Sequence, residues 1–82
     1  MGDWRIAFVA AALKGLKRLS LEDQLRMRDA IDRLMEGDIK KLRGRQNQFR
    51  LRVGGLRAIF TPNFKARTIV ILEIFPRAQD YR

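Results

Sequence analysis

Residues 49–60, FRLRVGGLRAIF, have the strongest structural signal in the chain. Apolar and basic residues alternate from Phe49 to Val53, which is the period of two expected of a half-buried strand. Gly54 and Gly55 are a two-residue turn signal, after which apolar residues return from Leu56 to Phe60. The stretch therefore predicts a β-hairpin in which Val53 lies opposite Leu56.

The short turn fixes the register of this hairpin and divides its side chains between two faces. The core face receives Phe49, Leu51, Val53, Leu56, Ala58 and Phe60, and the other face receives Arg50, Arg52 and Arg57. Arg52 and Arg57 lie directly opposite each other, and such like charges destabilise a sheet by up to about 1 kcal/mol unless an anion lies between them. The pairing favours a phosphate site, because guanidinium groups bind phosphate oxygens bidentately and stay charged. The alternative is that these long side chains splay into water.

The remaining segments predict an α+β fold. Residues 4–9 alternate as a short strand, and residues 10–19 and about 21–35 have the spacing of two antiparallel helices, with Ser20 as the N-cap of the second. Pro62-Asn63 begins a loop, and the apolar stretch from Thr68 to Phe75 predicts a strand covered on at least one face. The order β-α-α-β-β-β describes a two-helix hairpin packed on a small, mainly antiparallel sheet, with residues 1–82 in one domain.

The composition excludes several chemistries. The chain has no cysteine and no histidine, so disulfides, thiolate metal sites and histidine general bases are absent. The longest apolar run, residues 6–13, is shorter than the roughly 18 residues that a membrane span requires. It faintly resembles a signal peptide, but no basic region precedes it and helical spacing continues to Leu16. We therefore expect a cytoplasmic protein without a membrane partner.

The net charge of +9 is confined to one part of the sequence. Residues 1–38 contain seven basic and seven acidic residues, whereas residues 39–82 contain eleven basic residues and two acids. Such asymmetry is typical of a domain that binds a polyanion, most often nucleic acid. The alternative is a solvated basic surface, although solvated surfaces normally mix both signs. The candidate RNA-binding residues before the hairpin are Lys40, Lys41, Arg43 and Arg45.

The hairpin and the segment before it resemble the RelE/ParE toxin superfamily. The resemblance rests on Lys41-Leu42-Arg43-Gly44 and on residues 49–60, and it extends to the opening strand, the helix pair, Gly37-Asp38, Arg77 and Tyr81. It implies a RelE-like fold, a RelB-like antitoxin as partner, and an endoribonuclease that cuts mRNA in the ribosomal A site. It implies no metal or cofactor.

The resemblance also implies roles for individual residues. Arg50 and Arg52 fall where cleaving members of the family have basic residues, and Arg57 matches the arginine after the turn. Arg77 matches the arginine after the last strand, and Tyr81 matches an aromatic residue that stacks on a base. The implied reaction is attack of a ribose 2′-hydroxyl on the adjacent phosphodiester, with arginines stabilising the transition-state charge.

The sequence does not assign the general base or the general acid of this reaction to a residue. Arg52 stands where family members more readily offer a lysine, and an arginine gives up its proton too rarely to be a good base. Pro76 precedes Arg77 where relatives often have histidine or a small basic segment. We therefore expect Arg52 to stabilise charge first.

Two other functions are compatible with the sequence. ParE-like members of the superfamily share the fold but act on DNA gyrase without cutting RNA. A non-catalytic RNA-binding module would bind RNA and leave it intact. The clustered arginines together with Tyr81 favour the ribonuclease, and the lack of interleaved exposed aromatic residues across 39–67 counts against the binding module.

Overall fold

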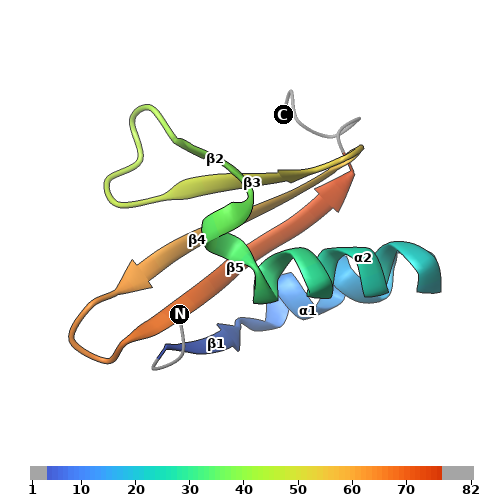
Figure 1. The fold of residues 1–82 in the computed structure, drawn as a ribbon, viewed down its shortest axis with the longest axis horizontal. Helices are drawn as coiled ribbons and strands as arrows, with labels where there is room; N and C mark the ends of the chain where they lie inside the picture. Colours follow the sequence, from blue (N-terminus) through green and yellow to red (C-terminus); the bar gives the residue numbers. More distant parts are fainter. Residues whose placement is uncertain (1–3, 77–82) are drawn as a thin grey trace.

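Within residues 4–76, the part of the chain that the computed structural model describes, five strands form one mixed sheet in the order β1-β5-β4-β3-β2. The strands are β1 (Arg5–Phe8), β2 (Asp38–Lys41), β3 (Phe49–Val53), β4 (Leu56–Asn63) and β5 (Thr68–Pro76). β1 runs parallel to β5, and every other neighbouring pair is antiparallel. Helix α1 (Ala10–Lys17) lies along β5, and helix α2 (Leu21–Asp32) packs on the side of β3 (Figure 1). The predicted α+β class, with a helical hairpin on a mainly antiparallel sheet, is confirmed.

The hairpin of β3 and β4 has the predicted register. Val53 pairs with Leu56 and Arg52 with Arg57, while at the far end Phe49 pairs with Phe60 and stacks on it at a ring-centroid distance of 5.6 Å. Gly54 has a φ of +57°, a left-handed conformation that a two-residue hairpin turn requires and that glycine adopts without a steric penalty.

The sheet has one strand more than the sequence predicts. β2 contains a single apolar residue, Ile39, so its four residues have no strand signal of their own. It forms because it pairs with β3, where Asp38 lies opposite Arg52 and Lys40 opposite Arg50. A strand of this kind depends on its neighbour and not on local propensity.

Two predicted boundaries are also wrong. The second helix ends at Asp32 and not near Met35, and the chain tightens into a 3-10 turn from Leu34 to Glu36, a common ending for an α-helix. β4 continues through Pro62, where we expected a loop, and Pro62 pairs with Ile69. A proline is tolerated there because β3 reaches only as far as Phe60, so that side of β4 needs no backbone donor.

The main core lies between the sheet and the two helices. Ser20 accepts a hydrogen bond from the Asp23 backbone N–H at 3.1 Å, as expected of an N-cap, and α2 then buries Met27 and Ile31 against the sheet. Each such side chain stabilises the fold by roughly 1.5–3 kcal/mol. Within the described part of the chain, no helix is long and apolar enough to cross a membrane.

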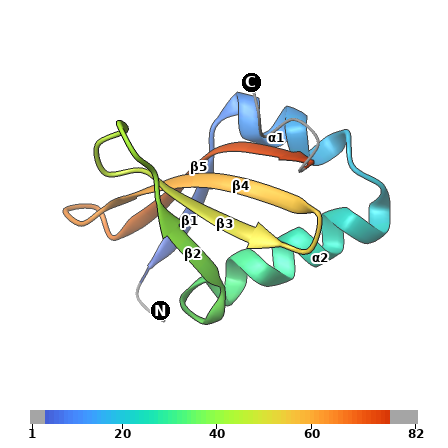
Figure 2. The ribbon, with the colours of Figure 1, turned by 90° about the horizontal axis from the view of Figure 1, so that it is seen from above.

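Helix α1 approaches β5 closely. β1 pairs with only the first half of β5, from Thr68 to Ile71, and Gly15 of α1 lies against the strand beyond that point, at Ile74. A Cβ atom on Gly15 would lie 2.1 Å from the carbonyl oxygen of Ile74, so only glycine permits this approach. Figure 2, which turns the molecule by 90°, shows α1 beside β5 and α2 on the side of β3 and β4.

A β-bulge changes the direction of side chains in β5. Ile59 pairs with Glu73 but the next residue, Phe60, pairs with Ile71, so Leu72 is the extra residue. Ile69, Ile71 and Ile74 are all buried in the core, although strict alternation would place Glu73 on the face of Ile71. The bulge therefore moves Glu73 and Phe75 to the opposite face of the sheet.

Gly15→Ala tests the close approach of α1 to β5. In an exposed helix the change would stabilise by about 1 kcal/mol, because alanine is the better helix former. Here we expect it to lower the free energy of unfolding by about 1–3 kcal/mol, because the helix must shift away from Ile74. The measurement is urea denaturation followed by circular dichroism.

Gly55→Ala is the matched control, since a Cβ atom there meets nothing within 4 Å. We expect its unfolding midpoint to stay close to that of the wild type. A Gly15→Ala protein as stable as the wild type would contradict the proposed steric role of Gly15.

Candidate nucleic-acid interface

The face of the sheet away from the main core presents most of the predicted arginines. One row across the strands consists of Lys40, Arg50, Ile59 and Glu73, and the next consists of Asp38, Arg52, Arg57 and Phe75. These eight residues define what we call the cleft face. The hairpin register places Arg50, Arg52 and Arg57 together on it, as predicted.

A cleft of about 750 Å³ opens beside this face, between α1 and the loop that joins β2 to β3. Helix α1 contributes Ala11, Lys14, Gly15 and Arg18, the loop contributes Leu42, Arg43 and Arg45, and the sheet contributes Ile59, Glu73, Ile74 and Phe75. Among the described residues, four cationic side chains and a single carboxylate thus line the cleft. A concave cationic surface of this kind concentrates field and attracts a polyanion.

Lys14 and Arg18 are cleft residues that the sequence analysis missed. They are four residues apart, so they lie on one side of α1. That spacing is visible in the sequence, but they belong to the electrically neutral half and no local signal says that this side of the helix borders a cleft.

The loop between β2 and β3 is tied to the end of β4 and to β5. The Thr61 hydroxyl donates to the backbone carbonyl of Asn47 at 2.6 Å, and the Asn47 side-chain amide donates to the carbonyl of Pro62 at 3.3 Å. Arg45 Nη1 lies 3.6 Å from Glu73 Oε2. These contacts hold the predicted RNA-binding residues Arg43 and Arg45 at the mouth of the cleft.

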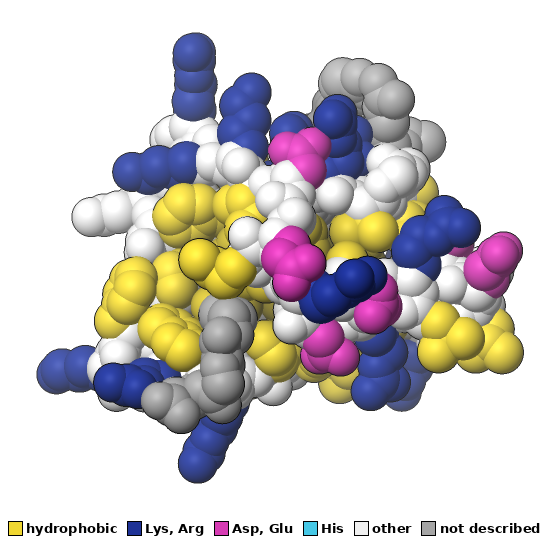
Figure 3. Space-filling model, in the orientation of Figure 1, with side chains coloured by type: hydrophobic (Ala, Val, Ile, Leu, Met, Phe, Trp, Pro, Cys, Tyr) yellow, Lys and Arg dark blue, Asp and Glu magenta, His cyan; other side chains and the backbone are white. Residues whose placement is uncertain are grey.

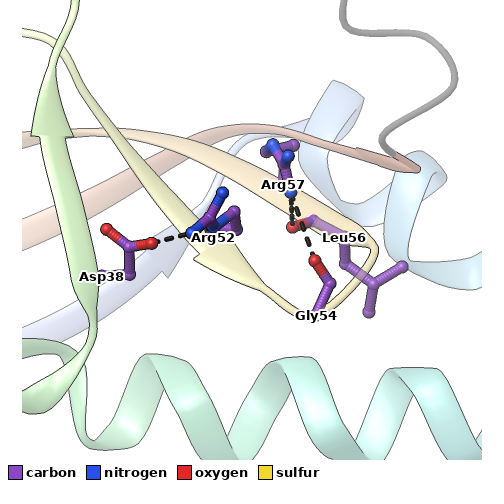
Figure 4. Close-up of polar contacts among 5 residues, drawn as sticks. All are labelled: Asp38, Arg52, Gly54, Leu56 and Arg57. Carbon is purple, nitrogen blue, oxygen red and sulfur yellow. Dashed lines mark hydrogen bonds and ion pairs between the residues drawn. The ribbon is translucent and has the colours of Figure 1, made fainter.

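Arg52 and Arg57 do not project into solvent as an unpaired couple, which corrects our expectation (Figure 4). Arg52 Nε lies 2.8 Å from Asp38 Oδ2, because the unpredicted strand β2 brings an acid opposite it. Arg57 is only 3 % exposed, and its Nη1 donates to the carbonyls of Leu56 at 3.0 Å and Gly54 at 3.4 Å. A guanidinium group can be buried only with such partners.

Arg50 is half-buried on the cleft face. Its Nε is buried and has no hydrogen-bond partner within residues 4–76. A buried donor left without an acceptor costs about 1–3 kcal/mol. Arg50 makes no ion pair within residues 4–76, so its charge is available to an anionic ligand on this face.

The other predicted site residues are distributed differently. Lys40 shares the cleft face with Arg50, whereas Lys41 pairs with Phe49 and lies on the core side of the sheet. Arg77 and Tyr81 lie outside the described residues. In the described part of the chain, no group of three Asp or Glu residues is placed to hold a metal ion.

An apolar groove of about 540 Å³ lies on the core side of the sheet, beyond the helices. It is lined by Trp4, Leu34, Met35, Ile39, Phe49, Phe60, Pro62, Phe64 and Ile69. Met35 is 73 % exposed and Phe64 70 %. Phe64 is thus an exposed aromatic residue within residues 39–67, where we expected none interleaved with the basic residues. Figure 3 shows hydrophobic side chains gathered in the left half of the view, with Lys and Arg side chains along the margin.

The structure resembles solved toxin structures. It matches the archaeal RelE–RelB complex from Pyrococcus horikoshii with a TM-score of 0.75 and 27 % identity, over 93 % of this chain and 97 % of that one. It matches the RelB–RelE complex from Methanococcus jannaschii with a TM-score of 0.75 and 26 % identity, over 92 % and 94 % of the two chains. The isolated E. coli RelE toxin also gives 0.75, with 15 % identity over 89 % and 83 %, so the similarity is to the toxin. No protein-family model and no curated protein sequence matches the chain.

Asp38→Asn tests whether Asp38 neutralises Arg52. Removing the carboxylate should free one guanidinium for phosphate, so affinity for a 2′-O-methylated single-stranded RNA should rise. The slope of the logarithm of the binding constant against the logarithm of the salt concentration should become more negative by about 0.7, the value for one further phosphate contact to a single strand. Fluorescence anisotropy over a series of salt concentrations measures both.

Asp29→Asn is the matched control, because it makes the same charge change in the Asp29–Arg33 pair on α2. We expect its salt dependence to equal that of the wild type. If both variants change binding equally, net charge and not the release of Arg52 is responsible.

Proposed function

Because this chain has the fold of the RelE-like toxin superfamily, we propose that it is the toxin of a type II toxin–antitoxin system and that it cleaves mRNA in the ribosomal A site. The observation that carries the proposal is the cationic cleft beside Arg50, in a chain of that fold. The toxin would act in the cytoplasm, where mRNA is translated, and residues 1–82 would form its single domain.

The proposed reaction is attack of a ribose 2′-hydroxyl on the adjacent phosphodiester, which leaves a 2′,3′-cyclic phosphate and a free 5′-hydroxyl. Negative charge grows on the phosphate in the transition state, and preorganised cations aimed at it stabilise that charge. Arg50 and Arg52 are the proposed charge-stabilising residues, and Arg57 adds a charge held rigidly by the hairpin carbonyls. No metal or cofactor has a role in this scheme.

The remaining predicted residues have proposed roles in binding. Lys40, Arg43 and Arg45 would contact the mRNA backbone on the cleft face and at the cleft mouth. Arg77 would add charge near the leaving group, and Tyr81 would stack on a base, a contact worth roughly 1–3 kcal/mol. Lys41, on the other side of the sheet, has no part in this scheme.

The two alternatives predict different outcomes. A ParE-like toxin would inhibit DNA gyrase and leave mRNA intact. A non-catalytic module would bind RNA with the same cationic surface without cutting it.

Arg50→Ala and Arg52→Ala separate catalysis from binding. Each should lower the rate of A-site cleavage by roughly 10²–10³, the usual cost of losing a group aimed at transition-state charge. Binding should fall only modestly, because several other phosphate contacts survive. Ribosomes programmed with a defined A-site codon are incubated with each variant, and the mRNA ends are mapped by primer extension.

Arg33→Ala is the control, since this exposed arginine lies after α2 and pairs with Asp29. Its cleavage rate should equal that of the wild type. A wild-type protein that cuts no A-site mRNA contradicts the ribonuclease proposal, and inhibition of gyrase supercoiling by that same protein would establish the ParE-like alternative.

We also propose that a RelB-like antitoxin binds in the apolar groove. The matched archaeal structures are complexes of RelE with RelB. The groove is lined by apolar side chains that could contact the apolar side of an amphipathic segment, and Lys41 and Lys65 flank its residues Phe49 and Phe64. Acidic residues beside the apolar ones would pair with these lysines, so the expected partner is a small acidic protein.

Met35→Asp tests this docking surface. It places a charge in the groove, so an acidic antitoxin encoded beside this chain should no longer co-purify with it after co-expression. Leu25→Asp makes the same change at a residue that is 62 % exposed on α2, outside the groove, and should retain the antitoxin. Equal retention by both variants would place the antitoxin elsewhere.

A further inference from the structure

Glu73 is the only carboxylate among the residues that line the cleft in the described part of the chain. Every other ionisable side chain of that lining is a lysine or an arginine, which are hydrogen-bond donors without an acceptor. A carboxylate is ionised at neutral pH and is a common general base. We infer that Glu73 accepts the proton of the attacking 2′-hydroxyl, an inference that rests on the proposed ribonuclease function.

The bulge at Leu72 is what puts Glu73 on the cleft face. In a regular strand Glu73 would share the core face of Ile69 and Ile71, where an acid could not be buried without a partner. The extra residue reverses the alternation, so Glu73 and Phe75 point to the cleft while Ile74 returns to the core. Bulges frequently re-aim side chains beside active sites in this way.

The position of Glu73 relative to Arg50 suits the reaction. The two residues lie in one row across the sheet, with Ile59 of β4 between them. Neighbouring strands are about 4.8 Å apart, so the two Cα atoms are roughly 10 Å apart. A phosphodiester above Ile59 would have Arg50 on one side and the Glu73 carboxylate, beside the ribose, on the other.

The Arg45 contact does not remove Glu73 from this role. The N···O distance is 3.6 Å and both side chains are about half exposed, at 54 % for Arg45 and 51 % for Glu73. An exposed pair of this kind contributes at most about 1 kcal/mol, so a substrate hydroxyl can displace it. Arg45 would then be adjacent to the phosphate that the hydroxyl attacks.

The proton and bond changes balance without an added reagent. The 2′-oxygen forms a bond to phosphorus as its proton passes to a Glu73 carboxylate oxygen. The bond from phosphorus to the 5′-oxygen breaks, and that oxygen takes a proton from water. Glu73 then returns its proton to the solvent, which leaves the cyclic phosphate and the 5′-hydroxyl as products.

Glu73→Gln removes the proton acceptor at nearly constant volume. On programmed ribosomes, its single-turnover cleavage rate should be lower than the wild-type rate by about 10²–10⁴. Its affinity for 2′-O-methylated mRNA should stay equal or rise, because a negative charge has left the cleft. The wild-type rate should fall as the pH is lowered into the range where carboxylates protonate, and this acidic limb should be absent in the variant.

Two further variants separate catalysis from structure. Glu73→Asp keeps a carboxylate and should retain the acidic limb at a reduced rate. Arg45→Ala breaks the ion pair but keeps Glu73, so it should weaken binding and retain the acidic limb as well.

Three outcomes would overturn the inference. The first is a Glu73→Gln protein that cleaves within about threefold of the wild-type rate. The second is a Glu73→Gln protein whose cleavage rate still falls at low pH. In both cases the ribonuclease proposal survives and another residue is the base. The third is a wild-type protein that cuts no A-site mRNA, which rejects the proposed function and the role of Glu73 together.

Discussion

A shift of one residue at the Gly54–Gly55 turn would exchange the two faces of the β3–β4 hairpin. The turn holds Leu51, Ala58 and Phe60 toward the core and the three arginines away from it. Because the side-chain period of a strand is two, no intermediate register is available. β2 is placed by its pairing with β3 and β5 by its pairing with β4, so this turn and the bulge in β5 together determine which side chains each face of the sheet presents.

The cleft depends on two local departures from regular structure. Gly15 lets α1 lie against the backbone of Ile74, which makes the helix a wall of the cleft, and the bulge at Leu72 turns Glu73 and Phe75 toward it. Either feature alone would leave a flatter or less polar surface. Such departures cost stability in a small domain, and they meet at the place where the cationic side chains converge.

Acidic side chains neutralise part of the positive charge on the cleft face and at the cleft. Asp38 contacts Arg52 on this face and Glu73 contacts Arg45 at the mouth of the cleft, so both cations are partly neutralised within the chain. Arg57 is buried against hairpin carbonyls, and Arg50 keeps a buried donor without an acceptor in the described residues. The apolar groove lies on the other side of the same sheet, and β3 contributes Phe49 to the groove and Arg50 to the cleft face. A nucleic-acid ligand and a protein partner therefore have separate surfaces on one strand pair.

Local patterns in the sequence were sufficient for the hairpin, its register, the two helices and the last strand, because turn chemistry and apolar periodicity act between near neighbours. They also located the basic half and the row of arginines. Four features needed the tertiary structure: strand β2, the Asp38–Arg52 pair, the burial of Arg57 and the cleft wall from α1. Strand β2, its ion pair and the cleft wall join segments that are distant in the chain, and the burial of Arg57 depends on how its side chain packs against the hairpin carbonyls. Lys14, Arg18 and Glu73 became site residues only when the sheet brought them together, and Glu73 did so through a bulge that alternation does not reveal.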